Sequence, residues 1–323
     1  MRVTALGAAV LILAAATGCG SSNDSDDGAE ATKTTKVRVG IIPIVDVAPL
    51  YLGEKMGFFG DHGIDVETVA AQGGAAIVPS VVSGQFQFGF SNTTSLMIAQ
   101  TKGVPVKSVA NGAASNGQPG GDVTGVVVGK DSPLESAKEL EGQKVAVNAL
   151  KNIGDTTVRE SVRLAGGDPS KVKFVEIPFD QMPAALADGR VDAAWMGEPS
   201  QTLAKAQGAR VIASPFAETD PRLTVATYFT SSKLQQENPE LVKNFAAAMR
   251  ESLDYARANP EEARKILTEY TKIDAETRAH LMLPAWVSEV NMPSLEKLAE
   301  LGEKDGLFGE DGAGELDLEG LFG

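Results

Sequence analysis

The stretch from Gly84 to Gly103 constrains the fold of this chain more than any other segment. Phe86, Phe88 and Phe90 alternate with polar or small residues, which is the period-two pattern of a β-strand. Hydroxyl and amide side chains follow over residues 91–95, and an apolar run after them predicts a short helix. In an open α/β sheet, small ligands bind beyond the carboxyl ends of the strands, where a helix start favours anionic or strongly polar groups. We therefore predict that this stretch forms one half of a ligand site.

The elements before this stretch complete a βαβαβ unit. Strands are predicted over residues 37–42 and 64–69, helices over residues 50–56 and 75–82, and the phenylalanine strand comes third. This order predicts a parallel sheet with right-handed crossover connections.

A second unit with the same order of elements follows along the chain. Its strands are predicted over residues 144–148, 172–177 and 191–195, and its helices over residues 156–165 and 182–187. The chain has 323 residues with 43% hydrophobic content, which suffices for two compact α/β units. The repeat therefore predicts two lobes of similar topology.

Two apolar runs flank the second unit, at residues 124–128 and 224–229. They predict that the chain crosses between the lobes twice and that the two crossings form a paired hinge. The first lobe is therefore assigned to residues 37–128 plus 226–323, and the second lobe to residues 129–225.

Loops at equivalent places in the two units are expected to face one another across a cleft. Each first, second and third strand ends in such a loop, so the polar and glycine residues of these loops and the aromatic residue at the end of the last strand are candidates for ligand contact. The candidate ligand-binding residues are Asp46, Gly73, Gly74, Ser91, Asn92, Thr93, Asn152, Trp195 and Glu198.

The candidates on which the site depends also have structural explanations. Residues 91–95 and Asp46 could cap helices, and Gly73-Gly74 could form only a tight turn. Trp195 could belong to the core, and Glu198 could stabilise the start of the next helix by its charge. The sequence leaves both alternatives open.

The N-terminal segment has the pattern of an export signal. Arg2 precedes an apolar stretch over residues 5–16 that is too short to span a bilayer, and small residues lead from it to Cys19. Cys19 resembles the acylated cysteine of a bacterial lipobox, which predicts a lipoprotein signal peptide over residues 1–18 and a lipid anchor on Cys19. The alternative is an ordinary secretory peptide cut near Gly18.

The segment over residues 19–36 has no apolar residue larger than alanine apart from Cys19, so it is predicted to be a flexible tether. We expect a protein outside the cytoplasm, anchored to the outer face of the cell membrane.

Composition argues against several functions. A net charge of −14 and a pI of about 4.7 argue against a nucleic-acid partner. One cysteine and two histidines exclude an internal disulfide and leave little material for a metal site or a Ser-His-Asp triad. We expect no metal, no cofactor and no catalytic residues.

Several short motifs, each weak alone, together resemble one family. It is the periplasmic solute-binding proteins of ABC importers for nitrate, sulfonates, taurine and pyrimidine precursors of thiamine. The resemblance covers residues 37–228 and is carried by VGIIP at 39–43, APLYL at 48–52, GFF at 57–59, GGAA at 73–76, DSP at 131–133, LEGQKV at 140–145 and GRVDAAW at 189–195.

The resemblance implies an α/β fold of the type II periplasmic-binding-protein class, in which each lobe is an open βαβαβ-based sheet flanked by helices. It implies a small-molecule solute as ligand and an ABC permease and ATPase as partners. The family also contains fungal enzymes that make the thiamine pyrimidine with a histidine and a cysteine cluster. This chain has no such cluster, so we expect no enzyme activity.

The resemblance leaves several solutes open. The sequence favours a small sulfonate or an amino-sulfonate such as taurine, with its sulfonate on the hydroxyl groups of residues 91–95 and its ammonium on Glu198. The alternative is a pyrimidine precursor bound by the Glu198 carboxylate and the Trp195 ring. A sensor subunit that reports to a receptor is a further possibility.

Overall fold

The computed structural model describes residues 34–309 and 316–323. The predicted signal peptide, Cys19 and most of the predicted tether therefore lie outside the described residues. From Thr34 onward the described chain forms one compact unit. No helix within these two ranges has both the length and the apolar character needed to cross a bilayer.

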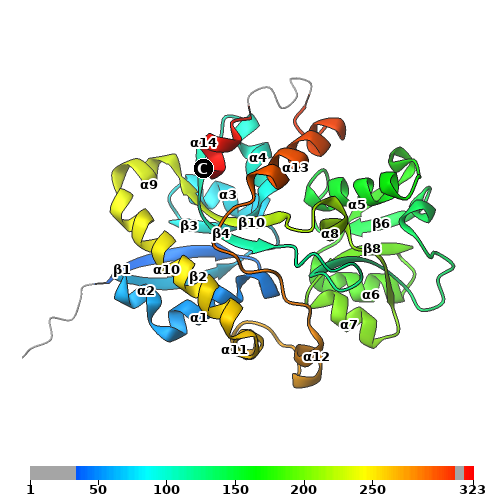
Figure 1. Ribbon diagram of the computed structural model, residues 1–323, viewed down its shortest axis with the longest axis horizontal. Helices are drawn as coiled ribbons and strands as arrows, with labels where there is room; N and C mark the ends of the chain where they lie inside the picture. The colour runs from blue at the N-terminus through cyan, green and yellow to red at the C-terminus, as the bar shows by residue number, and fades with distance from the viewer. Residues whose placement is uncertain (1–33, 310–315) are drawn as a thin grey trace, which may run out of the picture. The chain divides into compact units, whose positions relative to one another are not determined.

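The unit contains two five-stranded mixed sheets, and the two predicted βαβαβ units are both present (Figure 1). The first sheet has the strand order β2-β1-β3-β10-β4, with β1 parallel to β2 and β3, and β10 antiparallel to β3 and β4. Its strands are β1 (Thr35–Ile41), β2 (Ile64–Ala70), β3 (Phe88–Asn92), β4 (Val106–Ala114) and β10 (Thr224–Ser231).

The second sheet repeats this arrangement with the order β7-β6-β8-β5-β9. Strand β6 is parallel to β7 and β8, and β5 is antiparallel to β8 and β9. Its strands are β5 (Thr124–Val128), β6 (Lys144–Val147), β7 (Lys173–Glu176), β8 (Ala193–Gly197) and β9 (Arg210–Ala213).

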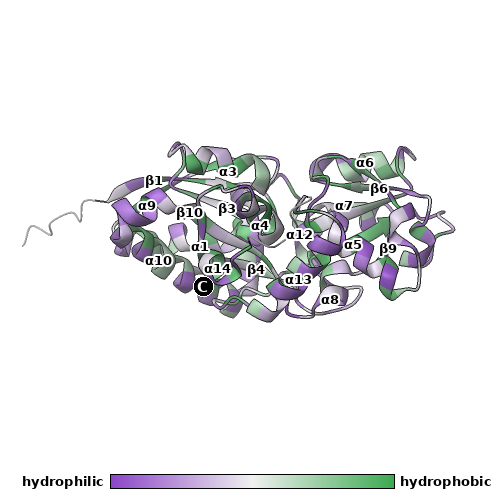
Figure 2. Ribbon diagram, turned by 90° about the horizontal axis from the view of Figure 1, so that it is seen from above, coloured by the Kyte–Doolittle hydropathy of each residue, from purple (hydrophilic) through white to green (hydrophobic). Residues whose placement is uncertain are grey.

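Helices cover both sheets, and Figure 2 separates the group around β1, β3 and α3 from the group around β6, α6 and α7. In chain order the α-helices are α1 (Ala48–Met56), α2 (Phe58–Asp61), α3 (Gly74–Val82), α4 (Thr93–Thr101), α5 (Ile153–Leu164), α6 (Met182–Ala187), α7 (Ser200–Ala206), α8 (Pro215–Thr219), α9 (Ser232–Glu237), α10 (Pro239–Ala258), α11 (Pro260–Ile266), α12 (Ala275–His280), α13 (Met292–Lys304) and α14 (Leu318–Phe322). Short 3₁₀ turns are η1 (Val45–Val47), η2 (Ala137–Leu140), η3 (Pro169–Lys171), η4 (Phe179–Gln181) and η5 (Leu267–Glu269).

The core of the first lobe is aromatic. Helix α10 buries residues at helical spacing, and its Phe245 ring stacks on Phe88 of β3, with ring centroids 3.8 Å apart and planes 7° apart. Tyr228 of β10 meets Phe245 edge-on at 5.9 Å. The phenylalanine strand is thus held between β1 and β10 in the sheet and under α10, which fixes where its carboxyl end lies.

The predicted lobe boundaries need correction at both crossings. Residues 124–128 were assigned to the first lobe, but they form β5, which pairs with β8 and β9 of the second sheet. Thr224 and Val225 were assigned to the second lobe, but they begin β10 of the first sheet. An apolar run alone does not say which sheet it joins. The crossings lie over residues 115–123 and 214–223, just before these two strands.

A third segment runs beside the two crossings. Ala285 forms an isolated antiparallel bridge with Ala114, and the side-chain amide of Asn116 donates a hydrogen bond to the carbonyl of Leu283 at 3.1 Å. Helix α12, just before this segment, contacts both α7 of the second lobe and α11 of the first. The connection between the lobes therefore involves three stretches of chain rather than the predicted two.

Candidate functional site

The carboxyl end of β3 leads directly into α4, as the sequence predicted. Asn92 is the last residue of the strand, and its Oδ1 accepts a hydrogen bond from the backbone N–H of Ser95 at 2.8 Å, which caps the helix. In the second lobe, Asn152 is the N-cap of α5, and its Oδ1 accepts a hydrogen bond from the N–H of the next residue, Ile153, at 2.8 Å. Asn152 Nδ2 also donates to Ser95 Oγ at 3.0 Å. The starts of the two helices therefore meet between the lobes.

A small cavity of about 40 Å³ lies beside this contact and is lined by both lobes. Aromatic rings form much of its wall: Trp195, at the end of β8, lies 5.5 Å from the Phe179 ring and 5.6 Å from the Phe216 ring. The lining residues are Ile42, Ile44, Asp46, Phe90, Asn92, Thr124, Asn148, Ile153, Phe179, Trp195, Gly197, Phe216, Val225 and Ala226. We call this space the inner cavity.

Two polar atoms of the inner-cavity lining have no partner among the described residues. The indole N–H of Trp195 and the hydroxyl oxygen of Thr124 are buried without a hydrogen bond. A buried polar group without a partner costs roughly 1–3 kcal/mol. An arrangement of this kind is expected where a bound molecule supplies the missing partner.

Asp46 brings a carboxyl group to the inner cavity. It lies in η1, only 6% of it is exposed, and burial raises its pKa to about 7, with Asp122 and Glu198 adding repulsion. The Trp286 indole N–H donates to the Asp46 carbonyl at 3.2 Å, which fixes this turn. Near neutral pH the Asp46 side chain can therefore both accept and donate a hydrogen bond.

A larger space of about 570 Å³, the outer chamber, adjoins the inner cavity. Ile42, Ile44 and Phe179 line both spaces, so the two are neighbours. The other outer-chamber residues are Pro43, Ala70, Ala71, Gln72, Asp180, Pro199, Ser200, Leu203, Tyr270, Thr271, Lys272, Ile273 and Asp274. The inner cavity alone has room for only a few water molecules, whereas the outer chamber has the volume usual for small-molecule sites.

The NMT1/THI5-like family model matches residues 44–263. The chain belongs to this family. Among curated relatives, the formylaminopyrimidine-binding protein of Halalkalibacterium halodurans is 25% identical over 95% of this chain and 88% of its own length. A putative aliphatic sulfonates-binding protein of Bacillus subtilis is 23% identical over 82% of this chain and 77% of its own length.

A solved structure has a fold similar to that of this chain. It is the ligand-binding component of an ABC-type import system from Staphylococcus aureus, with a TM-score of 0.76 and 14% identity over 90% of this chain and 97% of that one. The predicted α/β periplasmic-binding-protein fold is thereby confirmed.

Within this family fold, the inner cavity brings together Asp46, Asn92 and Trp195 of the predicted site residues. Asn152 lies at its edge, next to Ile153, and joins the lobes through Ser95. Sequence reasoning did not place Asn148 and Thr124 among the candidates. Asn148 directly follows β6, so the rule that ligands bind at carboxyl ends of strands could have found it.

Three predicted residues, Gly74, Ser91 and Thr93, have packing roles instead, and Gly73 directly precedes α3. A Cβ on Gly74 would come within 2.8 Å of the Ser91 Cα atom, so Gly74 and Ser91 allow α3 to lie close against β3. Thr93 Oγ1 donates to the carbonyl of Thr224 at 3.3 Å and ties α4 to β10. Gly73 begins α3 with extended backbone, and its nearest neighbour across the cleft is the Asn148 amide. These four line neither the inner cavity nor the outer chamber.

Glu198 lines neither space and is fully buried. Its carboxylate accepts hydrogen bonds from the Thr202 hydroxyl at 2.8 Å, the Thr202 backbone N–H at 3.1 Å and the Met282 N–H at 3.2 Å. Burial raises its pKa and these hydrogen bonds oppose the rise. Glu198 thus fastens the segment after α12 to the start of α7. The expected ligand contact is not what this geometry shows.

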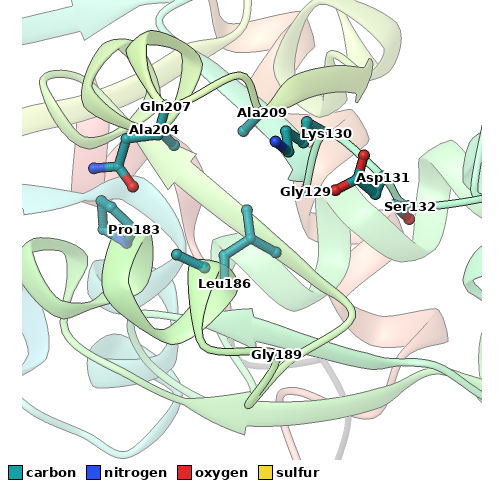
Figure 3. Close-up of a pocket in the computed structure, with 11 residues that line it drawn as sticks. Gly129, Lys130, Asp131, Ser132, Pro183, Leu186, Gly189, Ala204, Gln207 and Ala209 are labelled. Atoms are coloured by element: carbon teal, nitrogen blue, oxygen red, sulfur yellow. The ribbon is translucent and has the colours of Figure 1, made fainter.

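A further cavity of about 320 Å³ lies on the second lobe, between the loop after β5 and helices α6 and α7 (Figure 3). Because β5 is antiparallel to β8, the residues that follow β5 lie at the amino end of β8, opposite the inner cavity. This cavity shares no residue with the inner cavity or the outer chamber. Within residues 34–309 and 316–323, no group of three or more metal-binding side chains is present.

Proposed function

We propose that this chain is the solute-binding component of an ABC importer, which captures a small molecule between its lobes and delivers it to the permease. The fold and the family support this role, and the curated relatives are binding proteins. The inner cavity is nearly filled in the described structure. Binding therefore requires the lobes to separate and close again, for which three adjacent chain segments provide a hinge.

The lining of the inner cavity favours a planar heterocycle with an amino group, of the formylaminopyrimidine kind. The observation that carries this choice is Asp46, which lies among aromatic rings beside an unpartnered indole N–H. A protonated carboxyl can donate to a ring nitrogen and accept from the neighbouring amino group at once. Its pKa of about 7 keeps that proton available near neutral pH.

A sulfonate, which the sequence favoured, stays as the second candidate. Helices α4 and α5 both begin beside the inner cavity, and their N–H groups and dipoles favour an anionic group. Against this, Asp46 is the one ionisable side chain in the lining among the described residues, so no lysine or arginine there offsets a sulfonate charge. The aminopyrimidine is therefore the solute class that the geometry supports best.

Isothermal titration calorimetry on the purified protein tests this choice. The probes are formylaminopyrimidine, taurine, ethanesulfonate and nitrate. We expect formylaminopyrimidine to bind at least about tenfold more tightly than the others, a difference of about 1.4 kcal/mol. The Trp195→Ala variant should lose this binding, while Trp195→Phe, which keeps an aromatic wall but no N–H, should retain part of it. Tighter binding of taurine or ethanesulfonate would establish the second candidate.

The proposal includes a lipid anchor on Cys19, which lies outside the described residues. The export pattern of residues 1–18 supports it. Intact mass measurement of protein from bacterial membranes should show an acylated Cys19 as the first residue. The Cys19→Ser variant should leave the membrane fraction.

A further inference from the structure

The outer chamber has a size and a chemistry that a simple aminopyrimidine does not use. It offers about 570 Å³ next to an inner cavity of about 40 Å³, and both lobes contribute to it. Two of its walls are fixed aromatic rings. Tyr270 stacks on Tyr51 with centroids 4.1 Å apart and donates its hydroxyl hydrogen to the Ile44 carbonyl at 3.1 Å. The Phe179 carbonyl accepts from Ser200 Oγ at 2.8 Å.

The polar groups of the chamber are mostly acceptors. The hydroxyl hydrogens of Ser200 and Thr271 are already donated to the carbonyls of Phe179 and Leu267, so these two hydroxyl groups have only acceptor capacity left for a ligand. Asp180 adds a carboxylate from the second lobe, and none of the hydrogen bonds or ion pairs among the described residues involves its side chain.

The donors in the chamber come from the first lobe. They are the Gln72 amide and the Lys272 ammonium, whose side chains likewise enter no ion pair or hydrogen bond within the described ranges. A group that reaches from Asp180 to Gln72 or Lys272 would bridge the lobes and favour their closure.

The charged residues of the outer chamber restrict the charge of the substituent that it can bind. Asp180 and Asp274 oppose an anionic substituent, and Asp274 stays ionised because the Thr277 N–H, at 2.7 Å, holds its pKa below the ordinary value. Lys272 opposes a cationic substituent. A neutral hydroxyl group is not repelled by either kind of charge. It can donate a hydrogen bond to Asp180 or Ser200 and accept one from Lys272.

We infer that the solute has two parts, an amino-bearing heteroaromatic ring that enters the inner cavity and an uncharged, hydroxyl-rich substituent that occupies the outer chamber. Phe179, which lines both spaces, lies at the junction between the two parts. This inference rests on the proposed function, because the ring it requires is the one proposed for the inner cavity.

Calorimetry with a matched series of ligands tests the inference. Cytosine, cytidine and cytidine 5′-monophosphate share one aminopyrimidine ring and differ only in the substituent, and formylaminopyrimidine is measured beside them. We expect cytidine to bind at least about tenfold more tightly than cytosine and than the monophosphate. The Asp180→Ala variant should reduce the preference for cytidine over cytosine by about fivefold or more. Asp188→Ala, an exposed position outside both spaces, should leave this preference unchanged.

Each other outcome has a definite meaning. Cytosine binding as tightly as cytidine, or the monophosphate binding best, overturns the inference and leaves the proposed function in place. Binding of formylaminopyrimidine alone does the same. Binding of none of the four overturns the proposed aminopyrimidine function, and the inference with it.

Discussion

The side-chain amide of Asn152 in the second lobe donates a hydrogen bond to Ser95 Oγ in the first lobe at 3.0 Å, and both side chains are buried. Each residue lies at the start of a helix whose cap borders the inner cavity. The contact therefore joins the lobes beside the proposed ligand site, and we expect it to stabilise the closed arrangement and thereby to increase ligand affinity.

Ser95→Ala is expected to weaken ligand binding without unfolding the protein. The variant removes both hydrogen bonds between Ser95 Oγ and the Asn152 side chain, together worth about 1–2 kcal/mol, so the dissociation constant should rise roughly fivefold or more. Calorimetry with formylaminopyrimidine measures this. Ser83→Ala is the matched control, because the exposed Ser83 hydroxyl bonds only to the Ser80 carbonyl nearby. An equal change in both variants would contradict a role for the contact in closure.

Gly74→Ala should destabilise the first lobe, whereas Gly73→Ala should not. A Cβ on Gly74 would lie 2.8 Å from the Ser91 Cα atom. Relief of this clash requires the backbone of β3 or α3 to move, which costs free energy. We expect a loss of about 1–3 kcal/mol in the free energy of unfolding. A Cβ on Gly73 meets nothing closer than the Asn148 amide nitrogen at 3.7 Å, and its backbone is extended. Urea denaturation of the two variants provides the comparison, and equal losses would refute the packing argument.

The sequence predicted the architecture because the periodicity of each unit is strong. Alternating Phe86, Phe88 and Phe90 gave a strand followed by a helix, although β3 begins only at Phe88 and extends through Asn92. Periodicity could not predict which of the two sheets residues 124–128 join. An apolar run pairs with whichever partner strand the tertiary fold supplies.

Strand-end position predicts where a residue lies in the fold, but it does not predict the direction of its side chain. Position at the end of a strand selected Asp46, Asn92 and Trp195, which line the inner cavity together because carboxyl ends of parallel strands share one edge. It also selected Glu198, whose direction depends on Thr202 and Met282. Met282 is distant in sequence, so no local pattern predicts that its N–H donates a hydrogen bond to Glu198.

Glu198→Gln should reduce stability. All of the hydrogen bonds around this carboxylate are donated to it, including those from Thr202 and Met282. A glutamine amide would place its own N–H₂ group against one of these donors and leave it unpaired, at a cost of roughly 1–3 kcal/mol. Thermal denaturation at neutral pH measures the loss. The exposed Glu237→Gln, on α9, is the control, and an unchanged melting temperature in Glu198→Gln would contradict the assigned role.

Asp46→Asn should retain binding of formylaminopyrimidine, and Asp46→Ala should lose it by roughly tenfold or more. An asparagine amide donates and accepts as a protonated carboxyl does. In the wild type, affinity should be constant below pH 7 and fall about tenfold for each pH unit above it, because the free Asp46 carboxyl then loses its proton. The asparagine variant should show no such fall. Binding that strengthens above pH 7 would instead assign an ionised Asp46 to the complex.

The same Asp46→Asn variant should change the pH dependence of stability. Burial raises the pKa of Asp46 from 3.8 to about 7, so the folded protein holds this proton more tightly than the unfolded chain. Its contribution to stability is therefore present below about pH 4, is lost as the pH rises towards 7, and stays lost above that. Asparagine cannot titrate, so the variant should exceed the wild type by up to about 4 kcal/mol at pH 8 and by little at pH 4. Asp155, whose pKa burial raises to about 6, is present in both proteins and cancels in the difference. Urea denaturation from pH 4 to pH 8 measures that difference. A difference that does not change with pH would show that folding does not raise the pKa of Asp46.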